Sequence, residues 1–139
     1  EPIKLVDGGA QKRSFTYVTD GIDALMKIIA NKNGIANSKI YNIGNPKNNY
    51  SVRDLATMML DLAKQFPEYA DTAAQVKIVE TTSGEYYGAG YQDTQHRVPK
   101  INNTMADLDW EPKVEFTDAL RSIFGAYRHD VAAARQLMD

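Results

Sequence analysis

Short β-prone segments alternate with helical segments along the 139 residues, and this alternation limits the fold more than any other feature. Strands are expected where β-branched and aromatic residues collect, at 3–6, 14–18, 39–45 and 76–81. Four apolar side chains spaced i, i+3, i+4 and i+7 predict one helical face: Ile22, Leu25, Met26 and Ile29. The mixture predicts an α/β or α+β fold, and the length suits one domain.

Turn and capping residues mark the expected ends of several elements. The sequence DGG at residues 7–9 is a strong turn signal, so residues 3–18 are predicted to form a hairpin or a bent pair of strands. Thr19 or Asp20 can cap the helix that follows. Thr117 can cap the last helix in the same way.

A second amphipathic helix is expected in the middle of the chain. Ser51 and Asp54, three residues apart, resemble a capping box. An apolar stripe follows them: Leu55, Met58, Met59 and Leu62. Pro67 is expected to mark the limit of this helix, and residues 68–75 are interpreted as an Ala-rich connector. A short helix is predicted at 102–108.

The composition excludes several function classes. The net charge of -2, from 16 basic and 18 acidic residues, does not support nucleic-acid binding. There is no cysteine, and His96 and His129 lie far apart, so neither a disulfide framework nor a transition-metal site is expected. No run approaches the roughly 20 apolar residues of a membrane span, and no signal peptide is visible. Because the chain opens on Glu1 and enters a strand pattern at once, we expect the C-terminal part of a longer protein.

The first candidate site is the glycine-containing basic segment from Lys4 to Arg13. Gly8 and Gly9 let backbone N–H groups approach an anion closely. The basic side chains add positive charge, and arginine can hold a phosphate through two hydrogen bonds. A diphosphate would suit this segment, although a solvated hairpin with ordinary surface charges has the same spacing.

The second candidate is the polar loop at residues 88–101, GAGYQDTQHRVPKI. Arg97 could hold a carboxylate, and His96 could titrate near neutral pH. Three tyrosines in and beside the loop could stack on a base or a sugar: Tyr86, Tyr87 and Tyr91. From composition alone, a tyrosine-rich surface loop is an equal alternative.

Two further features are interpreted as structural. The sequence NIGNP at residues 42–46 could present backbone groups to a ligand but is more typical of a strand leading into a loop. Trp110, the single tryptophan, is expected to be a buried anchor. The sequence has no G-x-G-x-x-G, no tyrosine followed four residues later by lysine, and no evident Ser/His/Asp set. From its residues alone, the chain is half of a site, with anion and sugar contacts but no complete catalytic set.

Several motifs, taken together and in order, resemble one family. They are GGAQKRSFTYVTDGIDAL, YNIGNP, YYGAGYQDTQHRVPKI and LDWEP. They resemble the C-terminal portion of extended short-chain dehydrogenase/reductases of the NAD-dependent epimerase/dehydratase family, which act on nucleotide sugars. Within this family the resemblance is strongest to the UDP-glucuronic acid decarboxylase modules of bifunctional polymyxin-resistance proteins, which serve lipid A modification, and it covers residues 1 to about 128.

The resemblance implies that residues 1–139 form a nucleotide-sugar-binding C-terminal domain. Arg97 matches the catalytic arginine of the family. The residues that match UDP-sugar contacts are Lys4, Leu5, Val6, Asp7, Gly8, Gly9, Ala10, Gln11, Lys12, Arg13 and Tyr91. The family's catalytic Tyr-x-x-x-Lys pair and its Rossmann half have no counterpart in this sequence, so NAD is expected to bind the Rossmann half and no cofactor or metal to bind this chain.

The chemistry that the resemblance implies explains the arginine. Oxidation of UDP-glucuronate at C4 by NAD gives a β-keto acid, and loss of CO₂ then leaves an enolate. A cation beside the carboxylate stabilises the developing charge. Because a guanidinium pKa lies above about 12, Arg97 is expected to act electrostatically rather than as a simple acid. The role of His96 stays open.

The resemblance also bears on partners and alternatives. It implies a cytoplasmic enzyme that is homo-oligomeric in its full-length form, with UDP-glucuronate or a related UDP-sugar as its substrate and no turnover by this chain alone. The alternatives are a UDP-xylose or UDP-apiose/xylose synthase, a nucleotide-sugar 4-epimerase, and a UDP-sugar-binding module without catalysis.

Overall fold

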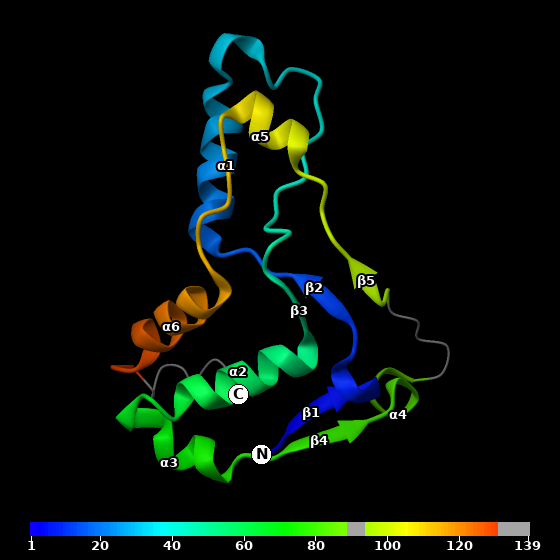
Figure 1. Cartoon of the computed structure of the whole chain (residues 1–139), viewed down its shortest axis with the longest axis vertical. Helices are drawn as coiled ribbons and strands as arrows, with labels where there is room; N and C mark the ends of the chain where they lie inside the picture. Colours follow the sequence, from blue (N-terminus) through cyan, green and yellow to red (C-terminus); the bar gives the residue numbers. More distant parts are fainter. Residues whose placement is uncertain (89–93, 131–139) are drawn as a thin grey trace. The chain divides into compact units, whose positions relative to one another are not determined.

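The computed structural model describes residues 1–88 and 94–130 and has the mixed α/β composition that the sequence predicts (Figure 1). The elements, in chain order, are β1 (Ile3–Val6), η1 (Asp7–Gly9), β2 (Lys12–Ser14), α1 (Val18–Ala30), η2 (Lys32–Gly34), β3 (Asn49–Ser51), α2 (Val52–Ala63), α3 (Pro67–Gln75), β4 (Ile78–Thr81), α4 (Ser83–Tyr87), β5 (His96–Arg97), α5 (Asn102–Leu108) and α6 (Phe116–Tyr127). Within this described part, no helix is both long enough and apolar enough to cross a bilayer.

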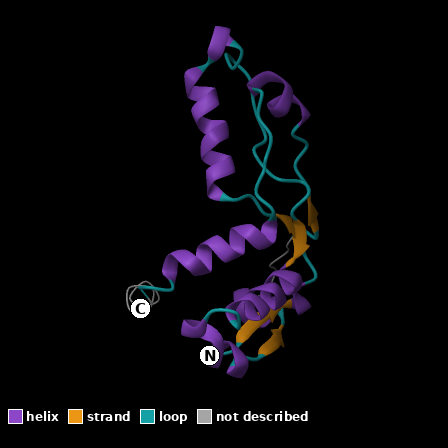
Figure 2. Ribbon diagram, turned by 60° about the vertical axis from the view of Figure 1, so that its left-hand side comes forward, coloured by secondary structure: helices purple, strands orange, loops and turns teal. Residues whose placement is uncertain are grey.

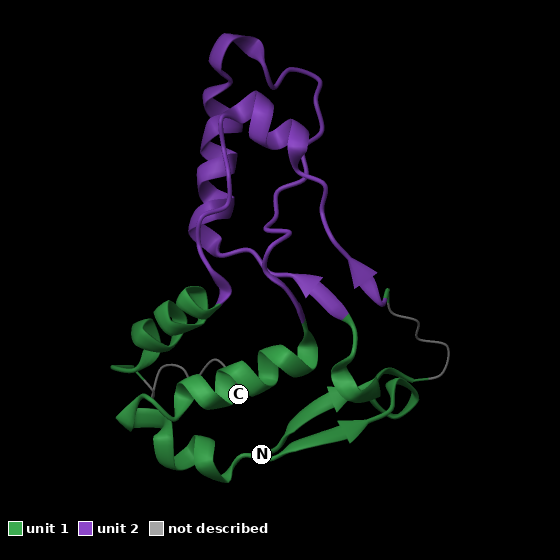
Figure 3. Cartoon of the chain, in the orientation of Figure 1, with its two compact units in different colours: residues 1–11, 51–94, 117–139 green, residues 12–50, 95–116 purple. Residues whose placement is uncertain are grey.

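The chain divides into two compact units, which Figure 3 shows in different colours. Unit 1 comprises residues 1–11, 51–94 and 117–139, and unit 2 comprises residues 12–50 and 95–116. Each unit is thus assembled from segments that are far apart in the sequence.

In unit 1, β1 pairs with β4 in parallel, in register from Ile3 opposite Ile78 to Val6 opposite Thr81. The predicted hairpin over residues 3–18 is therefore wrong. β1 takes its partner from a strand more than 70 residues further along the chain, and β2 pairs in a different sheet. Parallel pairing requires a long crossover, and no local turn signal can reveal such a partner.

The helices of unit 1 confirm one prediction and correct another. Ser51 caps α2 and forms a reciprocal capping box with Asp54, as expected. Residues 68–75 are helical, not a connector, because Pro67 opens α3 at the first helical turn, where its missing N–H costs nothing. Phe66 and Tyr69 pack against Phe124, with ring centroids 5.8 and 5.4 Å from it.

Strands β3, β2 and β5 form a three-stranded sheet, drawn in orange in Figure 2. Phe116 stacks between Phe15 and Tyr50, with a centroid distance of 4.7 Å to each. Because the first helical residue of α6 is Phe116 itself, Thr117 lies inside the helix and is not its cap.

The core of unit 2 forms around Trp110, which is buried as predicted. Its indole Nε1 donates a hydrogen bond of 3.0 Å to the carbonyl oxygen of Asp20. The carboxylate of Asp20 accepts hydrogen bonds from the backbone nitrogens of Lys113 and Val114, at 3.1 and 3.0 Å. Asp20 therefore fastens the 110–114 segment, and neither it nor Thr19 caps α1, which already begins at Val18.

Helix α1 forms as predicted, but its predicted apolar stripe does not face this core. The helix packs through Ala24 and Ile28, whereas the four stripe residues are 46–73% exposed: Ile22, Leu25, Met26 and Ile29. Residues 39–45 also differ from the prediction, because they are not a strand. Ile43 from this segment packs against the core of unit 2 instead.

Candidate functional site

The glycine turn η1 in unit 1 has the backbone conformation that the DGG sequence predicts. Gly8 and Gly9 have positive φ angles of 71° and 66°. A Cβ on Gly9 would lie 3.0 Å from the backbone nitrogen of Arg53 and 3.3 Å from the Leu5 side chain. The second glycine is therefore required by close packing against the start of α2.

The polar groups around the glycine turn already have partners. Arg53 Nε donates to the carbonyl oxygen of Gly8 at 2.9 Å, and the guanidinium of Arg53 forms an ion pair with Glu80. Asp7 Oδ1 accepts a hydrogen bond of 2.8 Å from the backbone nitrogen of Ser83. The turn is thus tied to α2 and to the end of β4, with one basic and two acidic side chains around it.

The parallel pairing of β2 with β5 in unit 2 brings two arginines together. Lys12 is opposite His96, and Arg13 is opposite Arg97. Because side chains alternate between the two faces of a strand, Arg13 and Arg97 share one face and Lys12 and His96 share the other. The pairing therefore separates His96 from its neighbour Arg97.

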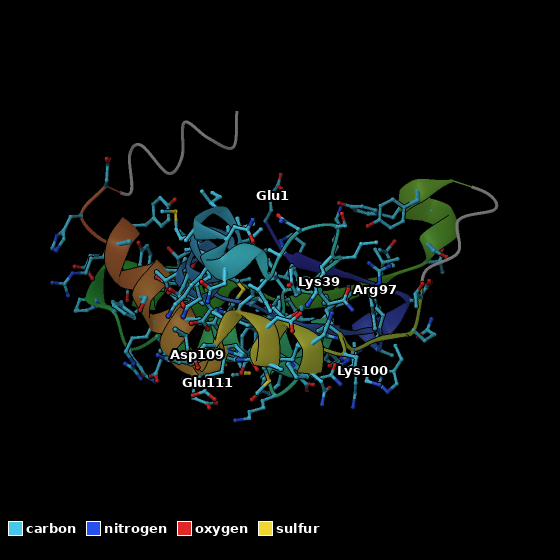
Figure 4. All side chains as sticks on the ribbon, turned by 90° about the horizontal axis from the view of Figure 1, so that it is seen from above. Glu1, Lys39, Arg97, Lys100, Asp109 and Glu111 are labelled. Carbon is cyan, nitrogen blue, oxygen red and sulfur yellow. The ribbon has the colours of Figure 1, made fainter. Side chains whose placement is uncertain are left out.

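Arg13 and Arg97 line an open pocket of about 630 Å³ in unit 2, here called the cationic pocket. Its lining includes Arg13, Ser14, Asn42, Gly44, Arg97 and Lys100. Among the residues that the structure describes, no acidic side chain lines it. Arg97 and Lys100 are labelled in Figure 4, where they come from β5 and from the segment that follows it. Three cations, with no carboxylate among the described lining residues, give the pocket a positive potential suited to an anion.

Other hollows of the described chain differ in character. A hollow beside Trp110 is lined by both signs of charge, with Asp109 and Glu111 (labelled in Figure 4) alongside Lys27. A hollow of about 320 Å³ in unit 1 is mainly apolar and includes Tyr69 and Phe124. Neither combines cations with an absence of acids, so the cationic pocket is the better candidate for a phosphorylated ligand. No group of residues in the described ranges has the composition of a metal site.

Elsewhere in unit 2, Lys39 and Asp107 form an ion pair. Lys39 Nζ lies 2.7 Å from Asp107 Oδ2, and the Tyr41 hydroxyl donates to the same oxygen at 3.1 Å. The hydrogen bond with Lys39 holds the pKa of Asp107 below its ordinary value, and the same bond raises the pKa of Lys39. Partial desolvation, and then the hydrogen bond to Asp107, raises the pKa of Tyr41.

The structure divides the residues predicted from the sequence between the two units. Lys4 to Gln11 belong to unit 1, whereas Lys12, Arg13 and Arg97 belong to unit 2. Of these, Arg13 and Arg97 line the cationic pocket. Tyr91 lies outside the described residues. Tyr86 and Tyr87 are exposed on α4, and their rings contact each other edge to face.

Three polar or charged side chains of the pocket were not among the predicted site residues: Ser14, Asn42 and Lys100. The sequence did mark two of them indirectly. Asn42 opens the NIGNP motif, and Lys100 lies in the polar loop that was singled out as a candidate site. The missing signal was the parallel pairing of β2 with β5, which joins segments more than 80 residues apart.

Comparison with known proteins agrees with the sequence motifs. Residues 1–44 match the model of the NAD dependent epimerase/dehydratase family. The chain is 61% identical to the PbgP3 protein from Burkholderia pseudomallei, whose crystal structure it matches with a TM-score of 0.85 over 97% of its own length. It spans 36% of the PbgP3 chain. The match of residues 1–44 to this family model and the similarity to this solved structure confirm the predicted resemblance to the NAD dependent epimerase/dehydratase family.

Proposed function

We propose that this chain is the nucleotide-sugar-binding part of an NAD-dependent UDP-glucuronate decarboxylase. The single observation that carries the proposal is the cationic pocket, in which Arg13, Arg97 and Lys100 meet without a lining carboxylate among the described residues. The chain spans 36% of the PbgP3 chain, so the activity is proposed for a longer polypeptide that contains these residues, here called the parent polypeptide.

The charge of the pocket suits the proposed ligand. UDP-glucuronate carries a diphosphate and a sugar carboxylate, and these are the groups that arginine binds best. Arg13 stands at the end of the segment predicted to contact UDP, and Arg97 lies opposite it in the sheet. We assign Arg13 to the diphosphate and Arg97 to the sugar carboxylate.

Arg97 would stabilise charge rather than transfer a proton. As the C–CO₂⁻ bond breaks, its electron pair moves toward the adjacent ketone and the negative charge moves from the carboxylate to an enolate. A guanidinium that faces both groups lowers the energy of this charge shift. Because the guanidinium remains protonated, the proton that reaches C5 would come from water or another group.

NAD is proposed to bind outside this chain. When bound, it supplies the hydride acceptor for oxidation of the sugar at C4. The glycine turn of this chain does not fit a dinucleotide, because β1 leads through η1 into β2 instead of into a helix whose N-terminus could hold a pyrophosphate. Within this chain, the proposed contribution is to hold the UDP-sugar and orient its carboxylate.

Product analysis of the parent polypeptide tests this proposal. Incubation with NAD and UDP-glucuronate is expected to release CO₂ and to form a UDP-4-keto-pentose, identified by mass spectrometry and NMR. The isolated chain should form no NADH under the same conditions. A reduced pentose product would indicate a UDP-xylose-type synthase, and a product that keeps its carboxylate would overturn decarboxylation altogether.

A further inference from the structure

The segment 42–46 has no role in the function proposed above, yet its first three residues, Asn42, Ile43 and Gly44, line the cationic pocket. It is fixed from behind. The backbone nitrogen of Asn45 donates to Thr16 Oγ1 at 3.0 Å, and the side chain of Asn45 is buried, with Nδ2 3.4 Å from the carbonyl oxygen of Val114. Hydrogen bonds of this kind hold a buried backbone in one position, so the segment 42–46 is a rigid surface for the residues that pack on it.

The segment 97–100 packs on the segment 42–46, and a hydrogen bond holds it at each end. Ser14 Oγ donates to the carbonyl oxygen of Arg97 at 3.3 Å. At the other end, Asn42 Nδ2 donates to the carbonyl oxygen of Lys100 at 3.1 Å. The side chains of Ser14 and Asn42 therefore hold in place the backbone segment that includes Arg97.

Between these two hydrogen bonds, Gly44 faces Pro99 without any room for a side chain. A Cβ on Gly44 would lie 2.6 Å from Pro99 Cγ and 3.3 Å from Pro99 Cβ. The pyrrolidine ring is bonded to its own backbone nitrogen, so it cannot rotate away as a flexible side chain would. A side chain at residue 44 would therefore force one of the two segments to shift. Because Asn45 holds the 42–46 segment, we expect the backbone that carries Arg97 to move.

We propose that Gly44, Asn42 and Ser14 are positioning residues that set the place of Arg97 in the cationic pocket. None of them is assigned to the reaction, and each acts through the backbone of residues 97–100. The inference rests on the proposed function, because it requires that the position of Arg97 matter for the ligand. A displacement of about 1 Å at a group that stabilises charge can lower a rate about 10²-fold.

The decisive variant is Gly44→Ala in the parent polypeptide, with Gly21→Ala as its matched control. A Cβ on Gly21, which is also in unit 2, would meet no atom within 4 Å. Gly44→Ala is expected to lower kcat about 10²-fold with a much smaller change in KM, whereas Gly21→Ala should keep both constants. A folded Gly44→Ala variant with the kcat of the unsubstituted protein would overturn the proposal.

Weaker variants guard against a Gly44→Ala protein that fails to fold. Asn42→Ala and Ser14→Ala each remove one hydrogen bond and should lower kcat about threefold to tenfold, with Ser14→Thr restoring the rate because it keeps the hydroxyl. Placed on an Arg97→Ala background, Asn42→Ala should have no further effect on kcat. A full additional loss on that background would show a general structural role and overturn the proposal.

The outcomes separate this inference from the proposed function. If the unsubstituted parent polypeptide releases no CO₂ from UDP-glucuronate, the proposed function fails. Calorimetry with inorganic pyrophosphate and with UDP-glucuronate then tests positioning by itself. Asn42→Ala should weaken the binding of one of these two anions in the presence of Arg97 but not on the Arg97→Ala background. If Asn42→Ala weakens binding equally with Arg97 and with Ala at residue 97, or weakens it in neither case, the proposed positioning of Arg97 is contradicted.

Discussion

Two regions of this protein carry the basic residues that suggest an anion site, and they treat charge in opposite ways. Around the glycine turn of unit 1, Arg53 is paired with Glu80 and bonds to the carbonyl of Gly8. In the cationic pocket of unit 2, Arg13, Arg97 and Lys100 line one hollow that no acidic side chain of the described residues shares. The charge of Arg53 is balanced by Glu80, whereas the described lining of the cationic pocket holds three cations and no acid and therefore suits an anionic ligand.

The comparison changes the weight of the two sequence candidates. The DGG turn is justified by its own packing, because Gly9 has a positive φ and abuts the backbone of Arg53. The cationic pocket instead gathers the side chains of Arg13, Arg97 and Lys100 around one hollow. The four predictions that follow test this contrast, beginning with the largest expected effect.

Arg97→Ala in the parent polypeptide should lower kcat for UDP-glucuronate decarboxylation about 10²- to 10³-fold, as expected for the loss of one group that stabilises developing charge. Binding of UDP, which has no sugar carboxylate, should change little. CO₂ release and calorimetry measure the two quantities. A variant that decarboxylates at nearly the rate of the unsubstituted protein would contradict the proposed role of Arg97 and, with it, the functional difference between the two regions.

Gly9→Ala should destabilise the chain by about 1–3 kcal/mol, because an alanine would have to adopt a positive φ and its Cβ would crowd the Arg53 backbone. Urea unfolding measures the change. Gly84→Ala is the matched control, since a Cβ there would meet no atom within 4 Å. If both variants are equally stable, packing does not require glycine at residue 9, and ligand binding becomes the better explanation for the glycines of this turn.

Lys100→Ala should weaken binding of UDP-glucuronate about fivefold, the effect of one exposed charge contact. The loss should shrink as salt is added, because mobile ions screen exposed charges. Lys47→Ala is a suitable control, since Lys47 is exposed and does not line the pocket. Calorimetry at low and high salt gives both numbers, and equal losses for the two variants would mean that Lys100 adds no local charge to the site.

Asp107→Asn should alter stability by the smallest amount and in a pH-dependent way. The pKa of Asp107 is lowered by Lys39, so its stabilising effect is complete above the ordinary carboxyl pKa and is lost as the pH falls through the lowered value. The raised pKa of Lys39 makes the same pair lose its effect as the pH rises through that value. The difference in Tm between the unsubstituted chain and Asp107→Asn should therefore vanish in strong acid. Glu111→Gln, at an exposed site, should give no such pattern.

Local sequence signals predicted much of the fold. The capping box at Ser51 and the helices that became α1, α2 and α5 depend on residues within a few positions of one another, and the burial of Trp110 was predicted from its residue type. Pairing between distant strands was not predicted, because nothing in 3–18 shows that β1 and β2 take partners more than 70 residues further along the chain. The same limit hid the proximity of Arg13 to Arg97, although each was named as a candidate.

Periodicity also predicted an apolar face of α1 without saying what it contacts. Ala24 and, one turn later, Ile28 are the α1 residues that pack in the core of unit 2. The four residues of the predicted stripe are exposed instead. In α2, by contrast, the predicted stripe includes Leu62, which is 4% exposed. An amphipathic pattern specifies which side of a helix is apolar, but burial depends on where the remaining chain runs.

Trp110 gives this chain an internal optical reporter. It is the only tryptophan, and it lies in the core of unit 2, where its indole donates a hydrogen bond to the backbone carbonyl oxygen of Asp20. Its emission therefore follows the integrity of unit 2, whereas far-UV circular dichroism follows the helices of both units. Coincident melting curves from the two signals would show that the units unfold in one cooperative step, and separate curves would give each unit its own transition.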